Sequence, residues 1–432
     1  MALLGTQRSV ALARQPGAGK LRRGWPPWLS IAFTLAALLL SSCASGTAGK
    51  VATPTVWPSP SATSSVMGAE QRAGPIRWGY DPSKATGRRD PPAEYAALPP
   101  GYRIEAVVGG LQRPTSIAFT PDGRMLVAEQ GGAVRVVKDG QLQPEPFYVF
   151  DAFVPDRDGV VELGLVGIAV DPDFGENGYV YAYYTAKNRE QRTVLARVRE
   201  DGGRGTDLEE LFSLDAAPRC CHIAGSLRFA PDGTLFVTVG DHQMEPEAQN
   251  RGSPFGAILR INRDGSAPAD NPFVDDDEAD PRVYAYGLRN PFDLVIDPAT
   301  GRIFATENGF IGQDAIIEVK PGANYGWPGY ELAVPLEQVE PPLLFYHMPI
   351  GPAGIELYRG EALPVLAGSL LFCQFHRGGA LHVITFGLDG SVDLDTIIAL
   401  GCTSDVLTGP DGFVYFLDYV GGVVYRIAAG RP

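Results

Sequence analysis

The sequence is short of basic residues and has no long apolar run. It holds 36 lysines and arginines against 50 aspartates and glutamates, which gives a formal net charge of −14. Binding to nucleic acid or to an anionic membrane surface needs clustered lysine and arginine, so this charge argues against both partners. The main apolar run, residues 31–40, is shorter than the ~20 residues of a membrane-spanning helix. A small neutral or cationic substrate fits this composition better.

Long helices are not expected beyond the first 45 residues either. The 432 residues are 45% hydrophobic and can bury a large core. They also include 52 glycines and 37 prolines, which is typical of many short strands joined by tight turns.

The N-terminal part has the features of a secretory signal. Lys20, Arg22 and Arg23 precede the apolar run, and a Leu-Ser-Ser-Cys sequence that ends at Cys43 follows it. This ending resembles a bacterial lipobox, in which the cysteine becomes lipidated. We therefore predict a lipoprotein signal peptide over residues 1–43 and an extracytoplasmic, membrane-anchored protein that touches the membrane only through its lipid. Residues 44–97 are rich in Pro, Ser and Thr and are predicted to be a disordered linker.

One strand-turn-strand pattern recurs across the remaining residues, 98–430. Each copy has alternating apolar residues, a turn built on Pro-Asp or Asp-Gly, and a second β-rich run. The turn prolines are Pro121, Pro172, Pro231, Pro298 and Pro410, and the last gap, of 112 residues, has room for a sixth copy at residues 368–384. Six such units predict an all-β fold, a six-bladed β-propeller of four-stranded antiparallel blades. Two stacked β-sandwiches are the alternative.

A propeller has to close, because an unpaired end strand is an edge prone to aggregation. Residues 102–108 near the start of the repeats and residues 423–427 at the end are both β-rich. We expect them to share one blade.

Two chain segments stand out because they directly precede predicted inner strands. His222, in Cys220-Cys221-His222, comes before the strand of the third unit, where its side chain would face the central channel. Arg289 and Asn290 hold the matching position in the next unit, where an arginine can stabilise a developing oxyanion or a cofactor carboxylate. The glycine-containing loop at residues 306–314 can present backbone carbonyls to Ca²⁺.

These motifs, in their order along the chain, resemble the soluble glucose/sorbosone dehydrogenase family. The resemblance covers about residues 100–428 and implies a six-bladed propeller, in agreement with the repeat count. The motifs that carry it are His222 with Gly225 and Leu227 before a Phe-x-Pro-Asp-Gly turn, Gly287-x-Arg289-Asn290-Pro291, Glu307-x-Gly309, Asn324-Tyr325-Gly326-Trp327-Pro328, and Gly164-Leu165-Val166-Gly167 before Asp171-Pro172-Asp173-Phe174.

The resemblance implies an enzyme, a quinoprotein oxidoreductase acting on CH–OH groups. Members of this family oxidise aldoses with pyrroloquinoline quinone (PQQ) held above a Ca²⁺ ion. By resemblance, His222 would be the general base that takes the proton of the sugar's anomeric hydroxyl as hydride passes to the quinone. Arg289 would lie against the quinone oxygens. The remaining contacts would be Glu162 and Asn290 to the cofactor and the backbone carbonyls of Gly309 and Phe310 to Ca²⁺.

Two segments depart from the family pattern. Better-known members carry a lysine for the cofactor's carboxylates where this chain has His376 and Arg377, to which we assign part of that role. They also carry two arginines where this chain has Cys402 and Ser404. PQQ brings three carboxylates, and each charged hydrogen bond to them is worth ~1.5–3 kcal/mol.

The cysteines add a hypothesis of their own. Without Cys43 the chain keeps Cys220, Cys221, Cys373 and Cys402, an even number that suits an oxidising compartment. Three pairings are possible, and the sequence does not choose among them. If Cys373 pairs with Cys402, it ties the last two blades, and Cys220 and Cys221 then form a vicinal disulfide beside His222.

Three functions follow from these observations. The first is a lipid-anchored, PQQ-dependent sugar dehydrogenase that passes electrons to an external acceptor. The second is a non-catalytic propeller that binds a carbohydrate or a protein partner. The third is a Ca²⁺-dependent hydrolase that acts on lactones.

Overall fold

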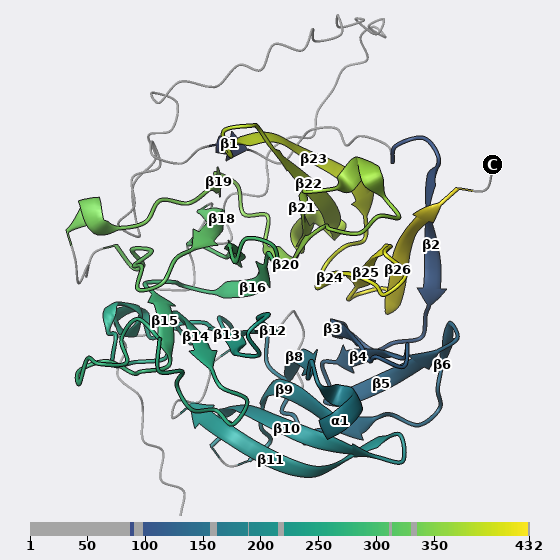
Figure 1. Ribbon diagram of the computed structural model, residues 1–432, viewed down its shortest axis with the longest axis horizontal. Coiled ribbons are helices and arrows are strands. Elements are labelled where there is room, and N and C mark those ends of the chain that lie inside the picture. The colour runs from purple at the N-terminus through teal and green to yellow at the C-terminus, as the bar shows by residue number, and fades with distance from the viewer. Residues whose placement is uncertain are drawn as a thin grey trace, which may run out of the picture. The chain divides into compact units, whose positions relative to one another are not determined.

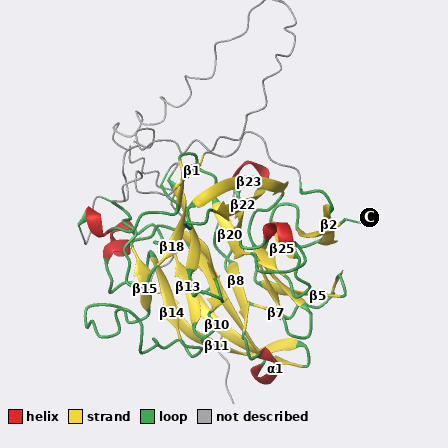
Figure 2. Ribbon diagram, turned by 45° about the horizontal axis from the view of Figure 1, so that its top comes forward, coloured by secondary structure: helices red, strands yellow, loops and turns green. Residues whose placement is uncertain are grey.

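The computed structural model describes residues 87–89, 98–155, 162–188, 190–214, 220–310, 313–329 and 335–430. Across residues 98–430 the described parts form six antiparallel sheets around a common axis, which Figure 1 shows face-on. This confirms the predicted six-bladed β-propeller and excludes the stacked sandwiches. Strands dominate the regular structure (Figure 2), and the short helix α1 (Phe174–Asn177) lies in a turn.

In blades 1 to 5 the first strand in sequence lies nearest the axis, and in blade 6 the innermost strand is β24. Blade 1 contains β3 (Pro114–Phe119), β4 (Met125–Glu129), β5 (Ala133–Lys138), β6 (Gln141–Leu142) and β7 (Tyr148–Val149). Blade 2 contains β8 (Leu165–Val170), β9 (Tyr179–Thr185), β10 (Thr193–Asp201) and β11 (Arg204–Leu214). Blade 3 contains β12 (Ala224–Phe229), β13 (Leu235–Val239), β14 (Ala257–Ile261) and β15 (Val283–Tyr286).

The second half of the propeller repeats this order. Blade 4 contains β16 (Pro291–Ile296), β17 (Ile303–Glu307), β18 (Asp314–Val319) and β19 (Leu344–Tyr346). Blade 5 contains β20 (Pro352–Leu357), β21 (Leu370–Gln374), β22 (Ala380–Phe386) and β23 (Val392–Leu400). Blade 6 contains β24 (Val406–Thr408), β25 (Val414–Asp418), β26 (Val423–Ala429) and β2 (Tyr102–Val108).

The repeated Pro-Asp-Gly sequences form the turns between the first two strands of several blades. In blade 1 the amide of Thr120 donates to the carbonyl of Arg124, and the amide of Gly123 donates back to Thr120 at 2.9 Å. Gly123 has φ of +86°, a left-handed conformation that glycine adopts at little cost. The same pair of hydrogen bonds recurs at Gly233 in blade 3 and at Gly412 in blade 6. Local turn chemistry thus places the hairpins.

Blade 6 closes the propeller. Its outermost strand, β2, comes from the start of the folded region and pairs antiparallel with β26, with Tyr102 opposite Ala429. In Figure 1 the blue β2 lies beside the yellow β26. The predicted sharing of one blade by the two chain ends is confirmed, and this pairing closes the ring.

A short strand lies within the range predicted to be a disordered linker. β1 (Gly87–Arg89) pairs in parallel with β19, with Gly87 opposite Leu344, and extends blade 4. The rest of residues 44–97, and the predicted signal with Cys43, lie outside the described residues. Within the described part, no helix is long and apolar enough to cross a membrane.

An ionic cluster fills the middle of the axis. Arg228 of β12 bonds to Asp293 of β16 at 2.9 Å and to Asp405, just before β24, at 3.1 Å. The same two carboxylates accept backbone amides of other inner strands, Asp293 from Ile355 and Asp405 from Ile117, each at 2.8 Å. Five of the six blades therefore meet in this cluster, beneath the pocket described below.

Candidate functional site

The residues just before the inner strands gather at one end of the axis. Some of them, including Glu162 and Ser404, line a pocket of about 370 Å³ together with residues that follow the second strands. His222, Arg289 and Asn290 are not among the described lining residues. A volume of this size is typical of small-molecule sites. The described lining residues are Thr115, Gln130, Glu162, Val166, Phe292, Asn308, Gly351, Pro352, Ala353, Phe375, His376, Thr403, Ser404 and Tyr419.

His222 lies directly before β12 and pairs with Asp241. Its Nδ1 is 2.6 Å from Oδ1 of Asp241, whose side chain is fully buried, whereas the histidine side chain is 12% exposed. A buried carboxylate next to Nδ1 favours the tautomer with the proton on that nitrogen. Within the described residues, Nε2 of His222 has no hydrogen-bond partner, so it is the nitrogen left to accept a proton.

Asp241 makes further hydrogen bonds besides the one to the histidine. Its Oδ1 accepts the amide of Gln243 and its Oδ2 accepts the indole N–H of Trp327, each at 2.8 Å. Its own amide donates to the carbonyl of Arg289 at 2.8 Å. The hydrogen bonds to both oxygens fix the orientation of the carboxylate toward His222.

Glu162 connects the pocket to the His222 segment. It lines the pocket, and its Oε2 accepts the amide of Ile223, the residue after His222, at 3.0 Å. Both carboxylate oxygens lie 3.3 Å from Nδ2 of Asn290. Asn290 is buried and also accepts the amide of Ala224 at 3.1 Å. The structure therefore brings Glu162, the His222 segment and Asn290 together. Their roles at a cofactor stay predictions.

Arg289 is fixed between two neighbours. Its Nη1 donates to the carbonyl of Asn308 at 2.9 Å, and its guanidinium lies 5.5 Å from the ring centre of Trp327. The amides of Arg289 and Asn290 both donate to Oε1 of Glu307, at 2.7 and 3.2 Å. Burial raises the pKa of Glu307 to about 8, and the two amides and the Arg289 charge oppose this shift. A permanent positive charge thus stands beside Asn308, which lines the pocket.

The predicted Ca²⁺ ligands lie in a tight turn next to this arginine. The amide of Gly309 donates to Asp314 at 3.1 Å, and a side chain at position 309 would collide with the carbonyl of Gln313. The ring of Phe310 stacks on Trp327. The described residues hold no group of three or more His, Cys, Asp or Glu side chains suited to a metal ion. A site made of backbone carbonyls is a different kind of site and stays a prediction.

The predicted cofactor contacts His376 and Arg377 are adjacent in the chain. His376 lines the pocket and is exposed, while Arg377 is exposed beside it with φ of +60°. No lysine or arginine is among the described lining residues. Arg113, just before β3, reaches Oε1 of Gln130 at 3.5 Å, and that oxygen also accepts the hydroxyl of Tyr419 at 2.7 Å. Arg113 makes no ion pair with a carboxylate in the described chain.

Arg113 also lies next to the segment where arginines were expected and are absent. The hydroxyl of Ser404 donates to the carbonyl of Pro114 at 2.8 Å, so the two segments touch. Burial raises the pKa of Tyr419, and the nearby Arg113 charge opposes that rise. A cation from blade 1 therefore stands close to the positions on blade 6 that carry none.

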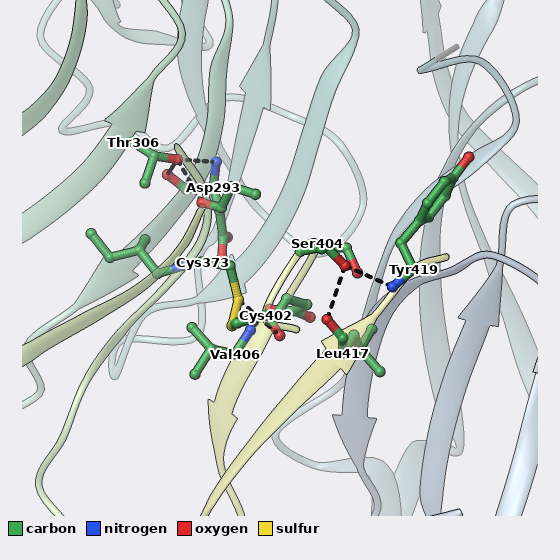
Figure 3. The surroundings of a disulfide bond; sticks show 12 residues. Asp293, Thr306, Cys373, Cys402, Ser404, Val406, Leu417 and Tyr419 are labelled. Carbon is green, nitrogen blue, oxygen red and sulfur yellow. Dashed lines mark hydrogen bonds between the residues drawn. A yellow bond between two sulfur atoms is a disulfide. The ribbon is translucent and has the colours of Figure 1, made fainter. Parts of the chain in front are cut away.

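Both disulfides that the sequence left open are formed in the structure. Cys373 of β21 pairs with Cys402, which precedes β24, and the bridge joins blade 5 to the segment entering blade 6. Figure 3 shows this bridge close to Ser404 and Tyr419. Cys220 pairs with Cys221, directly before His222.

Sequence reasoning missed the roles of Asp241, Glu307 and Arg113. Arg113 had a usable signal, since it precedes the first inner strand as Arg289 precedes the fourth. Asp241 comes two residues after the end of β13, and other acidic residues also end strands here, for example Glu129, Asp201 and Asp418. Only the register that places Ala224 opposite Val239 brings Asp241 to the histidine.

Comparison with known proteins assigns the family. Residues 111–425 match the family model described as glucose/sorbosone dehydrogenase. The match covers most of the sequence, so the chain belongs to the glucose/sorbosone dehydrogenase family.

Individual relatives agree with this assignment. An uncharacterised protein of Synechocystis sp. is 33% identical over 76% of this chain and 87% of its own length. The aldose sugar dehydrogenase of Escherichia coli K12 is 27% identical over 74% of this chain and 91% of its own. Quinoprotein glucose dehydrogenase B of Acinetobacter calcoaceticus is 28% identical over 55% of each chain.

A solved structure supports the fold. A Thermus thermophilus protein described as an oxidoreductase (glucose dehydrogenase) is 32% identical, with a TM-score of 0.67. The similarity covers 76% of this chain and 100% of that one.

Proposed function

We propose that this protein is a PQQ-dependent aldose sugar dehydrogenase that oxidises the C1 hydroxyl of a sugar. The observation that carries the proposal is the pair of His222 and Asp241, which leaves Nε2 of the histidine without a hydrogen-bond partner among the described residues. The segment adjoins the pocket, because the next residue, Ile223, donates its amide to the pocket-lining Glu162. The relatives named as sugar dehydrogenases support the reaction class, and the quinoprotein among them supports the cofactor.

The pocket fits PQQ in its size and in the types of group that line it. Phe375 and Tyr419 offer aromatic faces for a flat ring system, and Asn308 and Ser404 offer hydrogen bonds. The cofactor's carboxylates would be held by His376 and Arg377, together with Arg113. Gly309 and Phe310 would present carbonyls to Ca²⁺. When bound, PQQ supplies a quinone that accepts the electron pair of the sugar as hydride.

The chain's own residues handle the proton. Nε2 of His222 accepts the proton of the anomeric hydroxyl, and the imidazolium that forms lies against the carboxylate of Asp241. That contact stabilises the new charge and keeps the ring in place. Arg289, which Asn308 and Trp327 hold, adds a fixed positive charge where negative charge develops.

Reconstitution tests this function. Purified protein with PQQ and Ca²⁺ should reduce an artificial electron acceptor when an aldose is present. His222→Asn should lower kcat by roughly 10²–10⁴-fold, the usual contribution of a positioned general base, and leave PQQ binding intact. His382 differs from His222 in this respect. It also pairs with an aspartate, but its second nitrogen is hydrogen-bonded to Gln374 and is not left to accept a proton. Sugar oxidation without PQQ, or wild-type turnover by His222→Asn, contradicts the proposal.

A second candidate is a non-catalytic propeller that binds a carbohydrate. It is favoured by the lining of the pocket, where Glu162 is a negative charge and no described lysine or arginine faces it. Calorimetry separates the two candidates, because the second requires sugar binding in the absence of any PQQ binding.

We further propose that the protein is an extracytoplasmic bacterial lipoprotein anchored through Cys43. The lipobox-like sequence that ends at this cysteine supports the proposal. Metabolic labelling with palmitate should mark the wild type, and labelling of Cys43→Ser to the same degree contradicts it.

A further inference from the structure

The vicinal disulfide beside His222 has no part in the chemistry proposed above. Cys220 and Cys221 are bonded to each other, and both residues are partly buried. They occupy the two positions directly before the histidine that meets Asp241. A ring closed between adjacent residues restricts the backbone rotations of that pair, so it influences how the next residue is presented.

The backbone that follows the disulfide is held in an unusual conformation. His222 has φ of +61° and Ala224 has φ of +55°, both in the left-handed region that residues other than glycine rarely adopt. Regular pairing between β12 and β13 begins only at Ala224, and it shifts register before Leu227. His222 therefore lies before the ladder and in a strained conformation, which the surroundings must maintain.

The contacts around this segment converge on the same few residues. The carbonyl of Cys220 accepts the amide of Glu162, and the carbonyl of His222 accepts the amide of His242, each at 3.2 Å. Gly240 packs so closely that a side chain there would collide with the His222 carbonyl. The disulfide lies on the N-terminal side of His222, and the contacts of the His222 carbonyl hold its C-terminal side.

The two disulfides differ in what they contribute to global stability. The loop-closure entropy that a disulfide removes from the unfolded chain grows with the length of the closed loop. Cys373 and Cys402 are 29 residues apart, whereas Cys220 and Cys221 are neighbours. The vicinal pair closes almost no loop, so its effect is local.

We propose that the Cys220–Cys221 disulfide is a positioning element that holds His222 in its left-handed conformation, with Nδ1 on Asp241. The inference rests on the proposed function for its kinetic consequence but not for the geometry itself. Both cysteines are positioning residues, since they act through His222.

The test is the double variant Cys220→Ser/Cys221→Ser in the full-length protein with PQQ and Ca²⁺. We expect kcat for aldose oxidation to fall by about 10- to 100-fold, as small misplacements of a reacting group do. We expect KM and the PQQ dissociation constant to stay within about twofold of wild type. The residues proposed to bind the cofactor, Glu162, His376 and Arg377, keep their places. In a proton NMR spectrum, the downfield Nδ1–H signal of His222, identified by its loss in His222→Asn, should broaden or disappear.

Two controls make the outcome decisive. The matched variant Cys373→Ser/Cys402→Ser should lower Tm by several degrees, whereas the vicinal variant should leave Tm almost unchanged. In an Asp241→Asn background, Cys220→Ser/Cys221→Ser should lower kcat little further, because both changes act through the contact between His222 and Asp241.

Three results would overturn the inference. They are wild-type kcat with an unchanged Nδ1–H signal, additive losses in the Asp241→Asn background, and a fall in Tm as large as that of the Cys373→Ser/Cys402→Ser control. If the wild type shows no PQQ-dependent oxidation, the proposed function fails. The NMR comparison then still decides whether the disulfide positions His222.

Discussion

At the scale of single residues, the buried carboxyl of Glu307 sets the charge of the site's inner wall. Its Oε1 accepts two amides, while its Oε2 is buried without a partner among the described residues. Burial raises its pKa to about 8, with Asp241 adding to the rise and Arg289 opposing it. Near neutral pH the protonated form of Glu307 is therefore favoured. In this form Glu307 carries no negative charge to neutralise the guanidinium of Arg289.

Glu307→Gln should flatten the dependence of stability on pH. The folded-state pKa of about 8 lies above the unfolded value of 4.5, so the native protein retains a proton that the unfolded chain releases. The contribution of this group is thus full below pH 4.5 and is lost as pH rises to about 8, by at most ~1.4 kcal/mol per pH unit. Glutamine does not titrate. The free energy of unfolding in urea, measured at pH 5 and pH 8, should rise for the variant relative to wild type at the higher pH. An equal difference between variant and wild type at both pH values would contradict this.

At the scale of elements, the functional groups come from the short segments that precede the inner strands. Arg113 precedes β3, Glu162 precedes β8, His222 precedes β12, Arg289 precedes β16 and Ser404 precedes β24. The strands themselves carry the core, so these segments are where side chains can change without loss of packing. Because these segments vary independently, Arg113 of blade 1 can lie beside Ser404 of blade 6, where the family pattern has an arginine.

Arg113→Ala should weaken PQQ binding. The loss of one charge-assisted contact, worth ~1.5–3 kcal/mol, corresponds to roughly a 10- to 150-fold higher Kd by titration calorimetry. Arg113→Lys should recover part of the affinity, since it keeps the charge. The control is Arg204→Ala, which removes a charge from an exposed pair with Glu145 and should leave Kd unchanged. Equal Kd values for Arg113→Ala and wild type would show that the cofactor's carboxylates lie elsewhere.

At the scale of the whole molecule, the axial cluster and the closing blade hold the ring together. β2 and β26 join the two ends of the folded region, and Arg228 joins blades through Asp293 and Asp405. A cavity of about 20 Å³ adjoins this cluster, and the arginine's side chain keeps 16% exposure toward it. Burial raises the pKa of Asp293 to about 6 and that of Glu356 to about 7, and Arg228 opposes both shifts.

Arg228→Met should destabilise the propeller strongly. Removal of the cation leaves buried carboxylates without their partner, a change that costs roughly 3–5 kcal/mol. The loss should be smaller at pH 5 than at pH 8, because the carboxyls can then take up protons. Chemical unfolding at both pH values measures it, with Arg204→Met as an exposed control within about 0.5 kcal/mol of wild type. A pH-independent loss would mean that packing, not charge, is the main role of Arg228.

The sequence predicted the fold further than it predicted the site. The repeated Pro-Asp-Gly turns indicated the number of blades, because such turns depend on neighbouring residues alone. Position before an inner strand pointed to His222 and Arg289. Asp241 was not predicted, since nothing in its local sequence separates it from the other acidic residues near strand ends. Glu307 was recognised only as part of the Glu307-x-Gly309 motif, with no role of its own. The short strand β1 was not predicted, because its partner β19 lies more than 250 residues away in the sequence.

What the sequence alone determined is the strand-turn-strand repeat, the family and the candidate base, all of which rest on short-range patterns of residues. The tertiary structure decided which groups meet. It placed Asp241 on His222, Glu307 beneath Arg289 and Arg113 beside Ser404, and it selected one of three cysteine pairings. The physical reason is that these contacts join segments from different strands and blades, and their distances are set by sheet register and ring closure rather than by any local preference.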